Sequence, residues 1–197
     1  MAISAEAVKT LRERTGAGIM DCKKALAETD GDVDKAIEHL RKKGAALAEK
    51  KGSRSTNEGI VEAYIHPGSR LGVLIELNCE TDFVAKTEDF KSLARDLAMQ
   101  VAAANPAAVD RDDIPADLLE REKEIYVTQA KNEKKPDHII ERFVQGKLDK
   151  FYQEHALMEQ NFVKDPNKTI KQLVTDYIAK LGENITVKKF TRFQLGE

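Results

Sequence analysis

The amino-acid sequence predicts an α+β protein, with a small N-terminal bundle of three helices and a core in which a three-stranded antiparallel sheet packs with helices. Three observations predict this fold. Apolar residues recur at helical spacing up to residue 54, three later segments alternate with the two-residue period of a strand, and helical spacing fills most of the chain between them. The 197 residues, of which 41% are hydrophobic and 34% charged, are enough to form a buried core.

A change of charge near residue 54 divides the chain. Residues 1–54 hold 12 Lys and Arg against 9 Asp and Glu, whereas the remaining residues hold 20 against 25. The boundary segment 50–59 is polar, contains glycine and has no periodicity, which is typical of a linker. We therefore expect two domains, a helical domain at 1–54 and an α+β core domain at 55–197.

The sequence of the first domain predicts three short helices. Ser4 is a suitable N-cap for the first, and the glycine-containing segment 15–18 ends it. Asp21 is expected to cap the second helix, and Asp30–Asp32 to form the next turn. Gly44 is expected to end the third helix.

Three segments of the second domain alternate as strands do, and they are expected at about 59–66, 71–79 and 185–195. A sheet of three strands leaves edges uncovered, which oligomers commonly hide. Helical patterns fill the rest of the domain: one ends at Asn105-Pro106, one covers 117–132, one runs from Pro136 to Gly146, and the last runs from Asp165-Pro166 to Gly182.

Composition excludes several classes of protein. The formal net charge of −2 lacks the basic excess of a protein built to neutralise phosphates, so no direct nucleic-acid partner is expected. No apolar run is long enough to span a membrane, and the first residues lack the pattern of a secretory signal. The two cysteines, Cys22 and Cys79, exclude a disulfide framework and favour a cytoplasmic location.

Motifs for catalysis or cofactor binding are weak or missing. Gly16-Ala17-Gly18 lacks the third glycine of a dinucleotide fingerprint, and no phosphate-binding P-loop occurs. The four histidines have no cysteine at metal-ligand spacing, so no metal and no cofactor is expected. An enzyme that uses Cys79 beside Glu80 and Asp82 remains an alternative, although no general base is visible for it.

A modest basic run gives a second alternative. Lys42, Lys43, Lys50, Lys51 and Arg54 lie at the end of the first domain and in the linker. A solvated helix end explains them, but a small RNA- or ribosome-binding protein that uses this basic linker would show the same run. No aromatic residues are interleaved with these charges to stack on bases.

The segment 78–86, NCETDFVAK, is the most informative one. It follows a predicted strand and precedes a predicted helix, so Asp82 and Phe83 fall on a short connection between rigid elements. Two interpretations are open at this point. Either these residues are presented to a partner, or Thr81 or Asp82 caps the next helix and Phe83 folds back into the core.

Two stretches carry a family resemblance. Residues 11–26, LRERTGAGIMDCKKAL, and residues 76–86, ELNCETDFVAK, resemble the two signatures of the bacterial translation elongation factor Ts family. The similarity extends to the closing residues 190–197, FTRFQLGE. The length of the chain resembles the short form of the family, which lacks the duplicated core.

The resemblance implies a guanine-nucleotide exchange factor for elongation factor Tu rather than an enzyme. It implies that the N-terminal bundle is ubiquitin-associated-like (UBA-like) and docks on Tu. It also implies a homodimer. Because no cysteine lies near the C-terminus, where a disulfide could join the subunits, this homodimer is expected to be non-covalent. The resemblance assigns two sets of partner-binding residues: Arg12, Ile19 and Met20 for docking, and Thr81, Asp82, Phe83 and Val84 for dislodging the magnesium ion of Tu.

Overall fold

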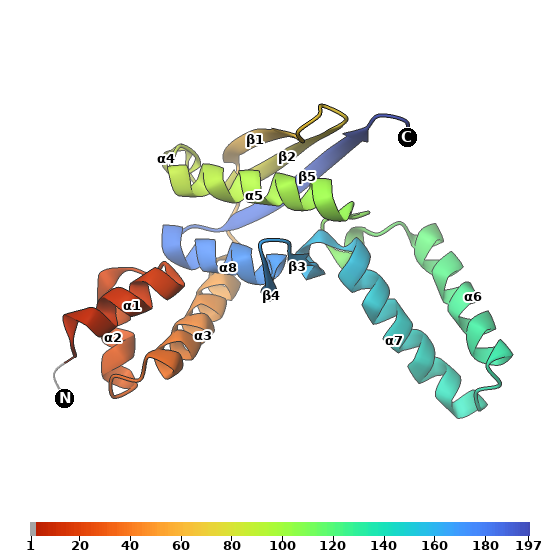
Figure 1. Ribbon diagram of the computed structural model, residues 1–197, viewed down its shortest axis with the longest axis horizontal. Coiled ribbons are helices and arrows are strands. Elements are labelled where there is room, and N and C mark those ends of the chain that lie inside the picture. The colour runs from red at the N-terminus through yellow and green to blue at the C-terminus, as the bar shows by residue number, and fades with distance from the viewer. Residues whose placement is uncertain (1–2) are drawn as a thin grey trace. The chain divides into compact units, whose positions relative to one another are not determined.

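Figure 1 shows the chain as a computed structural model, which describes residues 3–197. The predicted α+β class is confirmed. The predicted division at residue 54 stays a prediction. The chain forms two compact units, and each is described by itself. The first contains Met1–Ile60, Leu77–Leu93 and Gln172–Thr186, and the second contains Val61–Glu76, Ala94–Lys171 and Val187–Glu197.

Three helices open the first unit: α1 (Ala5–Thr15), α2 (Ile19–Glu28) and α3 (Val33–Lys51). Ser4 caps α1 as predicted, because its hydroxyl accepts a hydrogen bond from the Ala7 N–H at 3.1 Å. The helices pack pairwise around a small apolar core, which explains their helical spacing. That core consists of Leu11, Cys22, Ala25, Leu26 and Ala36.

Two helix boundaries predicted for this bundle are wrong. Gly18 is the N-cap of α2, so Asp21 lies inside its first turn and instead pairs with Lys43 at 2.6 Å. α3 continues through Gly44, which is buried. A Cβ atom at Gly44 would lie 3.4 Å from the Cβ of Ala179 on α8 (Ile170–Leu181), which is van der Waals contact, so Gly44 lies directly against α8.

The sheet has the strand order β1-β2-β5 and contains β1 (Glu58–Ile65), β2 (Leu71–Cys79) and β5 (Ile185–Gln194). All three predicted strands are confirmed to within one residue. The His66 N–H donates to the Leu71 carbonyl at 2.9 Å and closes the predicted hairpin. Burial of one side of β2 accounts for the alternation that predicted it, through Val73, Ile75, Leu77 and Cys79.

Five further helices are α4 (Asp82–Ala85), α5 (Glu88–Ala104), α6 (Ala116–Asn132), α7 (Asp137–His155) and α8. In the second unit, α6 and α7 lie side by side as a helical hairpin (Figure 1). Two single turns of 3-10 helix cover Arg111–Asp113 and Leu157–Glu159. Along residues 3–197, no helix combines the length and the apolar character needed to cross a bilayer.

Two predictions in the second unit are wrong. α7 does not end at Gly146 but continues to His155. Asp165-Pro166 does not begin a helix, because β4 (Asp165–Thr169) pairs there with β3 (Asn161–Phe162). The buried side chain of Gln100 fixes this hairpin, since its amide donates to the Asn161 carbonyl at 3.2 Å and accepts from the Val163 N–H at 2.9 Å.

Candidate functional site

The connection between β2 and α5 forms a single helical turn that exposes an aromatic side chain. β2 ends at the buried Cys79, and Thr81 then caps α4 by accepting a hydrogen bond from the Val84 N–H at 3.4 Å. Phe83 is 79% exposed, whereas Ala85 is buried. Of the two interpretations left open by the sequence, Thr81 does cap the helix, but Phe83 lies at the surface. We call Thr81–Val84 the tip.

Asp82 is held on the same turn by a neighbouring ammonium group. Its carboxylate accepts a hydrogen bond from Lys86 Nζ at 2.5 Å, and both side chains are exposed. This hydrogen bond is the main reason that the pKa of Asp82 lies below its ordinary value, and it raises the pKa of Lys86. Asp82 is therefore half of a surface ion pair and lies next in the chain to an exposed ring.

The base of the tip is tied to the loop between α8 and β5. The Glu183 carboxylate accepts a hydrogen bond from the Thr81 hydroxyl at 2.6 Å and from the N–H groups of Glu80 and Thr81 at 3.1 and 3.0 Å. In return, the Asn184 N–H donates to the Glu80 carboxylate at 2.7 Å, and Arg54 lies 3.2 Å from the same group. Glu183 and Asn184 could not be identified from the sequence, because no periodic pattern relates them to positions about 100 residues earlier.

The three docking residues implied by the resemblance lie on the surface of the N-terminal bundle. Arg12 is exposed in the last turn of α1, and Ile19 and Met20 are 54% and 75% exposed in the first turn of α2. Burial raises the pKa of the Cys22 thiol on α2, and Arg12 is close enough for its charge to oppose this in small part. All three docking residues belong to the same compact unit as the tip.

Most of the basic run that suggested an RNA contact is engaged within the chain. Lys51 is buried, and its ammonium donates to a carbonyl at the end of α8. Such pairing offsets part of the positive charge that would otherwise be available to release counterions from a nucleic acid. Four of the five cations have a partner in the chain: Lys42 binds Glu38 at 2.7 Å, Lys43 binds Asp21 at 2.6 Å, Lys51 binds the Gly182 carbonyl, and Arg54 binds Glu80 at 3.2 Å.

The cysteines have the environment of inert thiols. Both are free and buried, and burial together with the nearby Glu183 charge raises the pKa of Cys79 to about 11. The Cys79 thiol is therefore protonated at neutral pH, which disfavours a nucleophilic role. Over residues 3–197, no cluster of three or more His, Cys, Asp and Glu residues has the arrangement needed to hold a metal ion.

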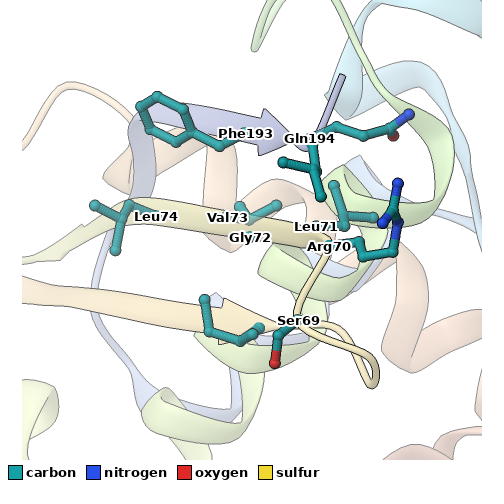
Figure 2. A pocket seen from close by; sticks show the side chains of 10 residues that line it. Ser69, Arg70, Leu71, Gly72, Val73, Leu74, Phe193 and Gln194 are labelled. Atoms are coloured by element: carbon teal, nitrogen blue, oxygen red, sulfur yellow. The ribbon is translucent and has the colours of Figure 1, made fainter. Parts of the chain in front are cut away.

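One face of the sheet is apolar and exposed in the second unit. We call Val61, Ile65, Leu74, Phe193 and Leu195 the apolar sheet face, and these side chains are between 48% and 69% exposed. Four of them line a hollow of about 530 Å³, and Figure 2 shows Leu74 and Phe193 on neighbouring strands. Because the solvent side of an antiparallel sheet is normally polar, an apolar one indicates a contact surface.

Comparison with known proteins places the chain in a family. Residues 4–197 match the family model described as Elongation factor TS. The chain is 58% identical to "Elongation factor Ts" of Caldanaerobacter subterraneus subsp. tengcongensis over 195 residues, which cover 99% of this chain and 98% of the relative. It is 57% identical to the protein of that name from Thermoanaerobacter sp. (strain X514), over 99% of this chain and 96% of the relative. For Carboxydothermus hydrogenoformans the identity is 58%, over 99% and 90%. The chain therefore belongs to the elongation factor Ts family.

Proposed function

We propose that this chain is a guanine-nucleotide exchange factor in translation elongation. It binds elongation factor Tu in its GDP-bound form, displaces the magnesium ion of Tu and promotes release of GDP, so that GTP can bind. The observation that supports this proposal most directly is Phe83, a large apolar side chain that is 79% exposed on a helical turn anchored at its base. A soluble domain gains nothing in stability from exposing such a ring, so a partner is its expected environment.

Nucleotide exchange requires no covalent step, and so the chain needs no catalytic residue and no cofactor. If the factor binds nucleotide-free Tu more tightly than Tu with GDP, thermodynamic linkage requires that it weaken GDP binding by the same factor. The task of the site is therefore to make contacts that are available only when the nucleotide site of Tu is distorted.

The magnesium ion of Tu is the natural target of such a distortion. In GTPases this ion neutralises phosphate charge and connects the phosphates to the switch residues. Phe83 inserts as an apolar wedge beside the elements that hold the ion, and Asp82 binds or repels nearby groups so that the shifted arrangement is kept. Thr81 and Val84 complete the tip: Thr81 caps the turn, and Val84 is a half-buried residue of the turn itself.

Docking is assigned to a second surface on the N-terminal bundle. Arg12 supplies a charge, and the adjacent Ile19 and Met20 supply exposed apolar surface. Arginine and buried apolar anchors are typical of residues that dominate binding energy at interfaces. With docking on the bundle and distortion at the tip, substitutions at the two surfaces have different kinetic effects.

We also propose that the protein is a non-covalent homodimer that associates through the apolar sheet face. A second copy presents the same apolar surface, as the twofold contact of a homodimer requires. Lys189 and Glu76, which pair at 3.5 Å, share this side of the sheet by strand alternation and contribute one charge of each sign. The face therefore has little net charge to repel its own copy.

The test is the release of a fluorescent GDP from Tu, followed by stopped flow in excess unlabelled nucleotide. The chain is expected to accelerate release in a saturable way, with a maximal rate far above the spontaneous rate. RNA is the control ligand for the alternative function. If the chain leaves GDP release unchanged but binds RNA in a salt-sensitive way, the RNA-binding interpretation replaces this proposal.

A further inference from the structure

Glu183 connects one carboxylate to three donors at the base of the tip. Its Oε1 accepts from the Thr81 hydroxyl at 2.6 Å, and its Oε2 accepts from the backbone N–H groups of Glu80 and Thr81. Thr81 is also the N-cap of α4 and accepts from the Val84 N–H. The carboxylate therefore binds the residue at which the turn carrying Phe83 begins.

The hydroxyl of Thr81 relays this contact into the helix. A hydroxyl has one proton and two lone pairs. The Thr81 hydroxyl can therefore donate its proton to Glu183 and still accept a hydrogen bond from the Val84 N–H. A charged acceptor makes such bonds shorter and stronger than a neutral one does. Because a glutamine in place of Glu183 would supply one oxygen and one NH₂ group, it cannot accept at both positions.

The loop that carries Glu183 is itself fixed. Gly182 ends α8 in the left-handed conformation at φ 74°, and its carbonyl accepts a hydrogen bond from the buried Lys51 ammonium. The Asn184 N–H donates to the Glu80 carboxylate, and the Asn184 side-chain amide donates to the Arg54 carbonyl at 2.9 Å. Glu183 thus holds the tip against a support that has little freedom to move.

We propose that Glu183 is a positioning residue for nucleotide exchange, an inference that rests on the proposed function of the tip. Glu183 does not contact Tu. Its carboxylate keeps Thr81 and α4 in the one arrangement that presents Phe83 to the partner. A wedge that had to be ordered during binding would lose part of its binding energy to that ordering, so a fixed base raises the maximal rate of exchange. Docking through the N-terminal bundle does not depend on it.

The test compares wild type, Glu183→Gln and Glu183→Ala, each with Phe83 intact and with Phe83→Ala, in stopped-flow release of fluorescent GDP from Tu. With Phe83 intact, Glu183→Gln is expected to lower the maximal rate about tenfold and to change the half-saturating concentration by less than about twofold. With Phe83→Ala, the same substitution is expected to have no further effect, because Glu183 acts through the ring. Glu88→Gln is the matched control, because Glu88 is a 91% exposed glutamate at the start of α5. This variant is expected to exchange as wild type does.

A second pair of variants covers the case in which the Glu183 variants fail to fold. Thr81→Val removes the hydroxyl and is expected to reproduce the loss, whereas Thr81→Ser retains the hydroxyl and is expected to restore exchange. The inference is overturned if folded Glu183→Gln keeps the wild-type rate, if its effect is equally large with Phe83→Ala, or if Thr81→Val exchanges normally. If Phe83→Ala itself exchanges as wild type does, the proposed function of the tip has failed instead.

Discussion

The Glu80 carboxylate accepts a hydrogen bond from the backbone N–H of Asn184 at 2.7 Å, across 104 positions of the sequence. This bond is the main reason that the pKa of Glu80 lies below its ordinary value of 4.5, and Arg54 adds to the effect. Because the ionised form is the stabilised one, Glu80 contributes to stability above pH 4.5. It loses that contribution as the pH falls below 4.5 and through the lowered pKa of the folded state.

Glu80→Gln is therefore expected to lower the free energy of unfolding at pH 7, and the difference from wild type is expected to shrink below pH 4.5. Urea unfolding of the wild type and the variant, measured between pH 7 and pH 3, gives the difference in the free energy of unfolding at each pH. Glu88→Gln is the control, since the exposed ion pair that Glu88 makes contributes at most about 1 kcal/mol to the free energy of unfolding. A difference that is absent at pH 7, or that stays constant down to pH 3, would contradict the assigned role of Glu80.

The raised pKa of Cys79 predicts low thiol reactivity. With a pKa of about 11, roughly 0.1% of this thiol is ionised at pH 8, and Cys22 is also buried with a raised pKa. Native protein is expected to react with a disulfide reagent far more slowly than denatured protein. Cys79→Ser is expected to keep the wild-type exchange rate. Fast labelling of native protein, or loss of exchange in a folded Cys79→Ser variant, would contradict the inert role of Cys79 and favour the alternative of an enzyme that uses this thiol.

Docking and exchange are expected to separate in the Arg12→Ala/Met20→Ala double variant. Both side chains are exposed, so the fold is expected to be unaffected. The half-saturating concentration is expected to rise about tenfold or more, because contact residues of this kind dominate interface energy. The maximal rate of GDP release is expected to stay within about twofold of wild type, since the tip is intact.

Lys42→Ala on α3 is the matched control for that variant, because Lys42 is an exposed cation of the same bundle on a helix that carries none of the three docking residues. It is expected to titrate Tu as wild type does. An unchanged half-saturating concentration in the double variant would show that the bundle docks elsewhere.

The apolar sheet face predicts the oligomeric state. Wild type is expected to have the mass of a dimer in size-exclusion chromatography with light scattering, and Phe193→Lys is expected to have the mass of a monomer, because burying an unpaired charge opposes association. Ile125→Lys replaces a 50% exposed apolar residue on α6 and is expected to leave the mass unchanged. A monomeric wild type, or a dimeric Phe193→Lys, would contradict this interface.

The strands were predictable from the sequence because one buried face imposes a strict period, as on β2. Helix boundaries failed where tertiary contacts outweighed local signals. Gly44 reads as a stop signal, but α3 continues because the glycine packs against Ala179. Asp165-Pro166 reads as a helix start, but the segment pairs as a strand in a hairpin fixed by the distant Gln100.

The candidate site was predictable from the sequence only in part. A position between a strand and a helix identified Asp82 and Phe83 as exceptional, but sequence alone left the direction of the Phe83 ring undecided. The support from Glu183 and Asn184 was not predictable, because hydrogen bonds between segments about 100 residues apart leave no periodic signal.

The measurement that tests the account most directly is GDP release from Tu with Phe83→Ala, with Phe83→Leu as the matched variant that keeps an apolar side chain. Truncation of a buried interface aromatic is worth about 2 kcal/mol or more, so Phe83→Ala is expected to lower the maximal rate about 30-fold, and Phe83→Leu less. A folded Phe83→Ala protein that releases GDP at the wild-type rate would contradict the account.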